Sequence, residues 1–547
     1  MLKKILVMSA LLASIGGANA QDYKVKVNTD KEPVAKGKFE PNWESLGEYQ
    51  TPEWYKNAKF GIWAHWGPQC AAEDGDWYAR SMYIQGDGKY RHHIDVYGHP
   101  SESGFIDVIN DWKAENWDPD KLVKLYKDAG AQYFMAMANH HDNLDMYDSK
   151  YQEWNTVNMG PKKDIIGGWA EAARKYGLPF GVSVHASHAW RWFEVAQQSD
   201  KKGPLKGVPY DGKLTKADGK GKWWEGYDPQ ELYAQNHPLS KNSEDPGSIH
   251  GQWAWENGAV LPDQAYCDKF YNRTIELINK YSPEVIYFDD TVLPLYPFCD
   301  AGLNITAHMY NKSMERNGGK NKAVVLGKIL NDEQKKCLTW DVERGTPDKI
   351  QPQTWQTCTC LGDWHYNKWT YYDNWYKSSK FIVNFLIDVV SKNGNLLLSV
   401  PVKSDGTIDK TEETIVKEIG EWMKVNGESI YGTTPWKVYG EGPAADKANP
   451  IKAQGFNEGA VGNLGADDIR FNQKKGALYI SFLGVPQNKE VSVKSCGKDA
   501  RLLKKIKNIT VLGSDEKITW KQNADALVMS VPSKVPCTQA VVYKVTY

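Results

Sequence analysis

Short apolar runs alternate with amphipathic segments between about residues 59 and 400. The runs are hydrophobic throughout rather than at every second position, which is typical of strands buried on both faces. They span residues 60–65, 133–138, 179–184, 285–288, 323–330 and 395–400. Between them, apolar side chains recur at helical spacing, as in 118–130, 164–176, 271–278 and 378–390. This alternation predicts a parallel sheet covered by helices.

The strand–helix alternation covers roughly 375 residues, and a (β/α)8-like TIM barrel is the economical way to close that many units. A doubly wound open sheet is the alternative. Its Gly-rich phosphate turn is not evident after the first predicted strand. We therefore expect an α/β fold with a catalytic barrel domain over residues 21–435.

The pattern changes after about residue 435. Leu478, Ile480 and Phe482 alternate with more polar positions, and short strand-like runs at 518–520 and 541–543 are separated by Gly, Asn and Asp. No long amphipathic helix is visible in this part. The pattern predicts a C-terminal antiparallel β-sandwich over residues 436–547.

The N-terminus has the order of a secretory signal peptide. Two lysines at positions 3 and 4 precede a short apolar run, and small residues follow up to Ala20. We expect residues 1–20 to be removed by a cut after Ala20, which predicts a secreted or periplasmic protein. No later segment has 18 consecutive apolar residues, so no membrane span is expected.

Charge and composition narrow the ligand class only partly. With 67 basic against 68 acidic residues the net charge is −1, which argues against nucleic acid as a partner. The chain has 23 Trp and 30 Tyr, whose rings pack in cores but also stack on sugars. Eight cysteines are too sparse for a disulfide scaffold, and Cys358-x-Cys360 lacks the second pair of a structural zinc site.

Polar side chains follow the predicted strands, where function collects in a barrel. They include five residues directly after apolar runs, namely His65, His140, His141, His185 and Asp289. Asp290 adjoins the last of these, and the segment 340–344 supplies two more carboxylates, Asp341 and Glu343. We interpret these residues as one site.

Two chemistries fit this set of residues. In the first, His65, His140, His141 and Asp289 bind zinc, as in metal-dependent barrel hydrolases. Adjacent histidines on a strand point to opposite sides, so His140 and His141 would bind one ion only if the backbone bends. In the second, histidines bind hydroxyl groups and two carboxylates hydrolyse a glycosidic bond. The abundant Trp favours the second chemistry.

Four segments resemble one known family. The stretch 52–67 (PEWYKNAKFGIWAHWG) resembles the opening of the family 29 glycoside hydrolases, the α-L-fucosidases. Further similar segments follow in the family order, namely 140–142 (HHD), 285–289 (VIYFD) and 391–398 (SKNGNLLL). The resemblance implies a barrel followed by a β-sandwich, a fucosylated glycan as substrate, and no metal or other cofactor.

The resemblance also implies catalytic roles. Asp289 in Tyr287-Phe288-Asp289 matches the family nucleophile, and Asp290 would take this role only if the strand register shifted by one residue. Glu343 stands in the interval where the family acid/base is expected. Asp341 and Asp363 are the alternatives to Glu343.

Sugar contacts are implied in the same way. His65, His140 and His141 match histidines that bind fucose hydroxyls, and Asp76-Trp77 resembles a Glu-Trp pair with the same function. Tyr287 stands where Trp is common in the family. His185 departs from the usual Tyr-Tyr-Ser and is expected to take over a hydroxyl contact. The expected activity is that of a secreted retaining exo-α-L-fucosidase; a catalytically inactive carbohydrate-binding protein is a further alternative.

Residues 201–222 fit neither domain, because they hold seven lysines and five glycines without an aliphatic cluster. In a barrel such an excursion lies on the catalytic rim, where it would attract an anionic, for example sulfated, glycan. A solvated decoration away from the site is the alternative. Four tryptophans follow, and we expect them to stack on the rest of the glycan: Trp223, Trp224, Trp253 and Trp255.

Overall fold

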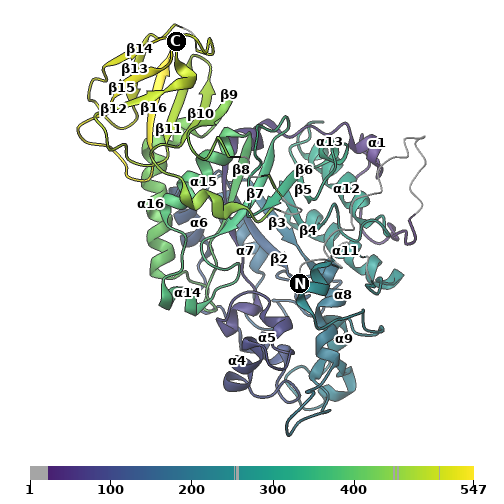
Figure 1. Ribbon diagram of the computed structural model, residues 1–547. Coiled ribbons are helices and arrows are strands. Elements are labelled where there is room, and N and C mark those ends of the chain that lie inside the picture. The colour runs from purple at the N-terminus through teal and green to yellow at the C-terminus, as the bar shows by residue number, and fades with distance from the viewer. Residues whose placement is uncertain are drawn as a thin grey trace, which may run out of the picture.

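The computed structural model describes residues 23–547 except 252, 254, 256, 257, 448, 449, 452–454 and 504, so the expected signal peptide lies outside the described residues. Eight parallel strands close a barrel (Figure 1), which confirms the predicted fold class. The strands are β1 Phe60–Ala64, β2 Tyr133–Asn139, β3 Phe180–Val184, β4 Val285–Thr291, β5 Val324–Lys328, β6 Thr339–Glu343, β7 Trp355–Cys360 and β8 Gly394–Ser399.

Long helices surround the barrel and cover its strands (Figure 1). They are α6 Pro119–Asp128, α7 Ile165–Lys175, α11 Gln264–Tyr281, α12 Ala301–Arg316, α15 Ser379–Ser391 and α16 Lys410–Asn426. Most begin at a polar N-cap: the Asp164 side chain accepts from the Gly167 amide, and the Ser378 side chain accepts from the Phe381 amide. Such caps satisfy amides that have no partner inside the helix, so they fix where each helix begins.

Strands β6 and β7 were not predicted, because their inward positions are polar. Gln356 on β7 accepts from the hydroxyls of Tyr55 and Tyr133 at 2.6 and 2.9 Å. Its amide nitrogen donates to Asp341 on β6 at 2.7 Å. Since these buried polar groups satisfy one another, the two strands do not need the apolar run that marks the other six.

The C-terminal part has two antiparallel sheets and a hydrophobic core of its own, which includes Trp436 and Phe471. The predicted boundary between residues 435 and 436 lies at the start of the first strand. One sheet contains β9 Thr434–Glu441, β10 Ile469–Lys474, β11 Ala477–Phe482, β13 Asn508–Val511 and β16 Val541–Thr546. The other contains β12 Glu490–Val493, β14 Trp520–Gln522 and β15 Leu527–Ser530. The predicted sandwich is therefore confirmed.

Insertions after the strands build up the lower edge of the molecule in Figure 1. They carry α4 Gly88–Val96, α5 Phe105–Asp111, α8 Ala189–Trp192, α9 Pro229–Tyr233 and α14 Lys368–Asp373. The excursion 201–222 joins this rim, because the Asp211 amide donates to the Pro100 carbonyl oxygen at 3.2 Å. Across the described ranges, no helix combines the length and apolarity needed to cross a membrane.

The tryptophans after the excursion do not form the expected exposed stacking surface. Trp224 and Trp255 are buried, so the expectation is wrong for them. Trp253 is also buried and stacks on His188 with a centroid distance of 3.9 Å. Only Trp223 is exposed, and its indole nitrogen donates to Asp107. These rings fill the space between the insertions and the barrel.

Candidate active site

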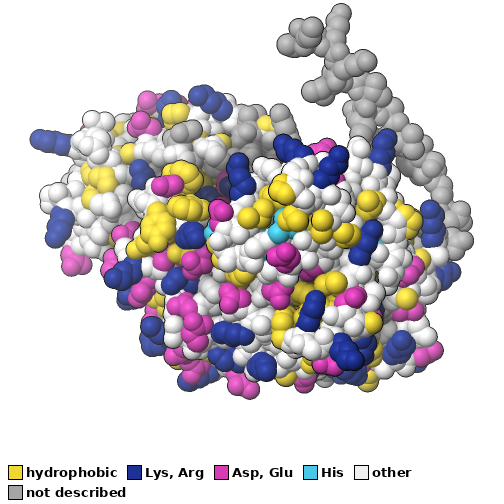
Figure 2. All heavy atoms as spheres, turned by 90° about the horizontal axis from the view of Figure 1, so that it is seen from below, with side chains coloured by type: hydrophobic (Ala, Val, Ile, Leu, Met, Phe, Trp, Pro, Cys, Tyr) yellow, Lys and Arg dark blue, Asp and Glu magenta, His cyan; other side chains and the backbone are white. Residues whose placement is uncertain are grey.

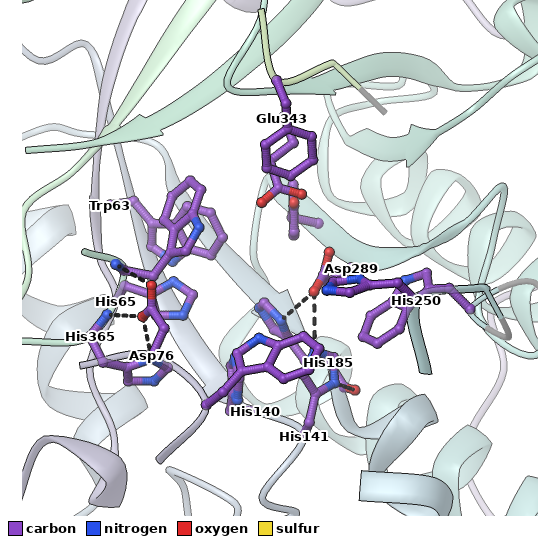
Figure 3. A pocket seen from close by; sticks show the side chains of 15 residues that line it. Trp63, His65, Asp76, His140, His141, His185, His250, Asp289, Glu343 and His365 are labelled. Atoms are coloured by element: carbon purple, nitrogen blue, oxygen red, sulfur yellow. Dashed lines mark hydrogen bonds and ion pairs between the residues drawn. The ribbon is translucent and has the colours of Figure 1, made fainter. Parts of the chain in front are cut away.

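One pocket opens where the barrel strands end (Figure 3). It brings together all nine residues that the sequence predicted for the site: His65, Asp76, Trp77, His140, His141, His185, Tyr287, Asp289 and Glu343. Trp253, predicted only to stack on the rest of the glycan, also lines the pocket. Five further lining side chains were not predicted: Trp63, His250, Trp364, His365 and Phe456. The sequence therefore located the pocket but only part of its wall.

The two consecutive carboxylates of β4 point in different directions, as successive strand residues do. Asp289 lines the pocket. Asp290 is buried outside it, where it accepts from His188 Nε2 at 2.9 Å and from the Ser187 hydroxyl. Asp289 is therefore the β4 carboxylate that a ligand in the pocket can reach.

Lys328, at the end of β5, connects two of the three carboxylates that line the pocket, and the sequence did not predict it. Its Nζ lies 2.5 Å from Asp289 Oδ1 and 2.8 Å from Glu343 Oε2. Burial alone would lower the pKa of Lys328, but the two carboxylates hold it well above its usual range. The one available signal was a lysine inside the otherwise apolar run 323–330.

Asp289 is held as an anion. Burial would raise its pKa, but the charge of Lys328 and the contacts of two histidines outweigh burial and keep the pKa well below its usual range. His141 Nε2 lies 3.2 Å and His185 Nδ1 lies 3.5 Å from Asp289 Oδ2. Figure 3 shows the contacts of the two histidines with Asp289, and Lys328 adds a positive charge at the other carboxylate oxygen.

The two histidines on Asp289 differ in their surroundings. His141 Nδ1 lies 2.8 Å from the carbonyl oxygen of His185, so both nitrogens of His141 face acceptors. Both contacts are hydrogen bonds only when this imidazole carries two protons. Burial, partly offset by Asp289, lowers the pKa of His185 to about 4, so its side chain is neutral above that pH.

His140 and His141 lie on the same side of the backbone, contrary to the strand argument. They follow the end of β2, where the pairing with β3 shifts register between Met137 and Asn139. Their ring centroids are 4.5 Å apart, and both rings line the pocket. A local irregularity of this kind re-aims side chains at the end of a strand.

Gln69 fixes the tautomer of His140. The Gln69 side-chain oxygen accepts from the Ala79 amide at 3.2 Å, which leaves its nitrogen to donate to His140 Nδ1 at 2.8 Å. The proton of the neutral ring is therefore on Nε2. Burial holds the pKa of His140 well below its usual range, so this ring presents one N–H donor.

Two histidine triads in the described ranges are close enough to hold a metal ion: His65–His140–His365 and His140–His141–His185. His140 belongs to both. A metal-binding imidazole usually donates its other N–H to a second group and leaves a lone pair for the ion. Gln69 does the opposite at His140, because it donates to one nitrogen and leaves the proton on the other. The triads therefore fit a metal poorly.

Several buried imidazole nitrogens have no hydrogen-bond partner among the described residues. They are both nitrogens of His65, Nε2 of His185 and Nε2 of His365. Burial lowers the pKa of His65 well below its usual range, so this ring offers one donor and one acceptor. Buried polar groups rarely stay unpaired, and neutral imidazoles beside one another suit a ligand with several hydroxyl groups.

Asp76 and Trp77 form the wall beside His365. Asp76 accepts from the backbone amides of Trp364 and His365 at 3.0 and 2.7 Å. Trp77 has a left-handed backbone (φ 64°), which is uncommon outside glycine, and its ring centroid lies 4.8 Å from that of His250. Tyr287 also lines the pocket, and Lys328 Nζ lies 5.3 Å from its ring centroid. This position makes Tyr287 a support for Lys328.

Glu343 is the pocket carboxylate that shares the Lys328 amine with Asp289. The alternatives lie elsewhere, because Asp341 is buried against Gln356 and Asp363 accepts from Asn367 at 2.7 Å. Figure 3 shows Glu343 entering from the side opposite His140 and His141. Its backbone oxygen accepts from the Phe456 amide at 2.9 Å, so a segment that follows β9 completes the pocket.

Comparison with known proteins agrees with this geometry. A family model described as Alpha-L-fucosidase matches residues 27–428, and one described as Alpha-L-fucosidase C-terminal domain matches residues 465–546. The chain is 25% identical over 520 residues to tissue alpha-L-fucosidase of Mus musculus, covering 92% of each chain. It is 26% identical over 410 residues to plasma alpha-L-fucosidase of Homo sapiens, covering 73% of each.

Solved structures share the fold. The alpha-fucosidase of Thermotoga maritima, in complex with a mechanism-based inhibitor, has a TM-score of 0.66 at 23% identity, covering 93% of this chain and 100% of that chain. Alpha-L-fucosidase isoenzyme 1 from Paenibacillus thiaminolyticus has a TM-score of 0.59 at 20% identity, covering 91% and 99%.

Proposed function

The chain belongs to the alpha-L-fucosidase family of glycoside hydrolases, and we propose that it is a secreted retaining exo-α-L-fucosidase acting on terminal α-L-fucosyl groups of oligo- or polysaccharides. The short distance between the two carboxylates is the observation that supports a retaining mechanism. One amine contacts both Asp289 and Glu343, so their nearest oxygens are at most about 5.3 Å apart, the sum of the two contacts. Retaining enzymes place their carboxyl groups about 5–5.5 Å apart, whereas inverting enzymes need about 6.5–9.5 Å.

In the proposed reaction an oxygen of Asp289 attacks the anomeric carbon of fucose. The bond to the leaving oxygen breaks, and Glu343 transfers a proton to that oxygen. The product of this step is a fucosyl ester of Asp289. Glu343 then takes a proton from water, the water oxygen attacks the anomeric carbon, and the ester bond breaks to regenerate Asp289.

The surroundings of Asp289 support its role as nucleophile. A nucleophilic carboxylate must be ionised, and the low pKa that Lys328 gives Asp289 ensures this over the ordinary pH range. Lys328 also offsets the repulsion between the two carboxylates when both are ionised. During attack, charge leaves Asp289, so the amine becomes free to interact more strongly with Glu343.

The histidines support recognition of the fucose hydroxyls. His140 presents an N–H donor, and His65, His185 and His365 carry nitrogens that a bound sugar would satisfy. Hydrogen bonds that strengthen as the ring distorts would favour the transition state over the bound substrate.

Product stereochemistry and one variant test this function. The enzyme should release nitrophenol from nitrophenyl α-L-fucoside, and proton NMR should show α-L-fucose before the anomers equilibrate. The Asp289→Ala variant should lose at least about 10⁴-fold in kcat, as expected when a covalent nucleophile is removed. First appearance of β-L-fucose would contradict retention, and full activity of Asp289→Ala would contradict the assigned nucleophile.

Two outcomes would point to the other classes considered. Loss of activity after dialysis against a chelator, with recovery on adding zinc, would indicate a metal-dependent hydrolase. Binding of fucose by calorimetry without any turnover would indicate a carbohydrate-binding protein.

Export and an anionic glycan are further parts of the proposal. The basic, apolar and small-residue order of residues 1–20 supports export, and N-terminal sequencing of the exported protein should begin at Gln21.

Exposed lysines of the excursion, such as Lys206, Lys216 and Lys220, support attraction of sulfated glycans. Replacing these three by Gln should raise KM for sulfated fucosides and leave KM for neutral ones unchanged.

A further inference from the structure

Four exposed aromatic side chains lie in one seven-residue segment of the rim, 369–375. Trp369 is 49% exposed, Tyr371 37%, Tyr372 69% and Trp375 71%. They belong to α14 and the turn after it, and together they are called the aromatic platform here. Large exposed aromatic clusters are unusual on a soluble surface and mark binding sites.

The backbone beneath the aromatic platform is firmly anchored. Asn367 caps α14, and the Lys368 amide donates to the Glu73 carbonyl oxygen at 2.9 Å. Thr370 is buried, and its carbonyl oxygen accepts from the Trp375 amide at 3.0 Å. The rings are therefore presented by a fixed turn, which reduces the entropy lost when a ligand binds.

The aromatic platform follows the wall of the pocket along the chain. The same segment carries Trp364 and His365, which line the pocket, and Trp369 follows His365 by four positions. Since a chain spans at most about 3.6 Å per residue, the Cα atoms of His365 and Trp369 lie within about 14 Å of each other. A short oligosaccharide spans this distance. Figure 2, which views the molecule from below, shows hydrophobic side chains gathered around an exposed histidine on that side.

We propose that the aromatic platform binds the glycan chain beyond the terminal fucose, by stacking its rings on the apolar faces of sugar rings. This rests on the proposed exo-fucosidase function, in which everything beyond fucose belongs to the leaving group. Flat rings edged by hydroxyl and indole groups suit carbohydrate, whose rings have an apolar face and a polar edge. Lys368 and Asp373 flank the rings with opposite charges, so the matching ligand is a neutral glycan segment.

The test compares substrates with and without a long leaving group. For each enzyme, kcat/KM on a neutral fucosylated pentasaccharide is divided by kcat/KM on nitrophenyl α-L-fucoside. This ratio should fall at least tenfold in the double variant Trp369→Ala/Trp375→Ala, mainly through KM on the pentasaccharide. Trp375→Tyr should recover most of the loss caused by Trp375→Ala, because tyrosine keeps a stacking face.

Trp520→Ala is the matched control, because Trp520 is 38% exposed on β14 of the other domain. Its ratio should equal that of the unmodified enzyme. An unchanged ratio in the double variant would overturn the platform proposal, as would light scattering that shows a dimer dissociating in that variant. If the unmodified enzyme does not hydrolyse nitrophenyl fucoside, the proposed function is refuted instead. The two outcomes are therefore distinguishable.

Discussion

Lys328 is the residue that relates the two proposed catalytic carboxylates to each other. It is buried and contacts both, so neither carboxylate has an environment independent of the other. Asp289 was predicted because it follows an apolar run, and Glu343 from the resemblance to the family, but nothing along the chain indicates which side chain lies between them. That information depends on the closing of β4, β5 and β6 around one point.

Replacing Lys328 by Ala should move the pH profile of the enzyme. Without the amine the pKa of Asp289 rises, and activity requires ionised Asp289, so the acid limb of kcat/KM should shift to higher pH. At the optimum, kcat should fall about 10²–10³-fold, as when one electrostatic group is removed from an active site. Lys336→Ala, on the exposed part of α13 Gln334–Cys337, is the control. An unmoved acid limb would refute this role of Lys328.

Asp341 should respond to pH through stability rather than catalysis. Burial raises its pKa to about 7, so the folded protein keeps a proton that the unfolded chain releases near pH 4. The free energy of unfolding therefore falls as pH rises from about 4 to 7. An asparagine at position 341 does not ionise, so Asp341→Asn escapes this loss. The free energy of unfolding of the variant minus that of the unmodified protein should therefore increase by about 2–4 kcal/mol between pH 5 and pH 8. Urea denaturation at the two pH values measures the Asp341 effect.

Azide rescue tests which carboxylate is the acid/base. Azide should restore turnover of a nitrophenyl fucoside by Glu343→Ala. If azide activates Asp341→Asn but not Glu343→Ala, the acid/base role belongs to Asp341.

At the scale of elements, the segment 455–459 fixes the backbone that carries Glu343. Gly455 forms a β-bridge with Glu343, and the Glu458 amide donates to the Arg344 carbonyl oxygen at 2.9 Å. The Glu458 carboxylate also accepts from Arg344 Nε at 2.6 Å. The proposed acid/base is therefore positioned from both sides of the domain boundary, although the sequence places the two segments more than a hundred residues apart.

Gly455→Ala should weaken this positioning. Gly455 has φ +126°, and a Cβ there would come within 2.1 Å of the Glu343 carbonyl oxygen. We expect kcat on a fucosylated oligosaccharide to fall at least tenfold, with a smaller loss on nitrophenyl fucoside, whose leaving group needs less help from an acid. Gly459→Ala is the control, because its Cβ meets nothing within 4 Å. Equal losses on both substrates would show that Gly455 does not act through Glu343.

At the scale of the whole molecule, buried charges join the barrel to the sandwich. Arg470 on β10 donates to Asp388 on α15 at 2.6 Å, and Lys392 contacts the other Asp388 oxygen at 2.8 Å. The two cations outweigh burial and lower the pKa of Asp388 to about 2. Because the carboxylate is ionised in the folded state, its stabilising effect is present above about pH 4 and is lost as pH falls toward 2.

Arg470→Ala should lower the free energy of unfolding by about 3 kcal/mol at pH 7, near the lower end for breaking a buried ion pair, because Lys392 remains. Differential scanning calorimetry should show a lower Tm and, if the sandwich loosens first, two transitions. Arg501→Ala, exposed on the sandwich, should leave the thermogram unchanged. A thermogram of Arg470→Ala identical to the unmodified protein would contradict this coupling.

The sequence by itself determined the fold class, the two domains and the nine predicted pocket residues. The fold and part of the site depend on local order: apolar runs specify buried strands, and polar residues directly after them lie at the open end of a barrel. The remaining pocket residues were predicted from the resemblance to the α-L-fucosidase family, namely Asp76, Trp77, Tyr287 and Glu343. The catalytic and binding roles of those residues stay predictions until kinetics tests them.

The tertiary structure decided what local order does not contain. It showed β6 and β7, whose buried polar groups pair across the barrel, and it placed Lys328 between the two carboxylates. It also showed that the exposed aromatic surface lies in the segment 369–375, whereas the sequence had predicted it at the tryptophans after the excursion. In each case the cause is physical: burial and pairing depend on distances between residues far apart in the chain, and only the closed barrel sets those distances.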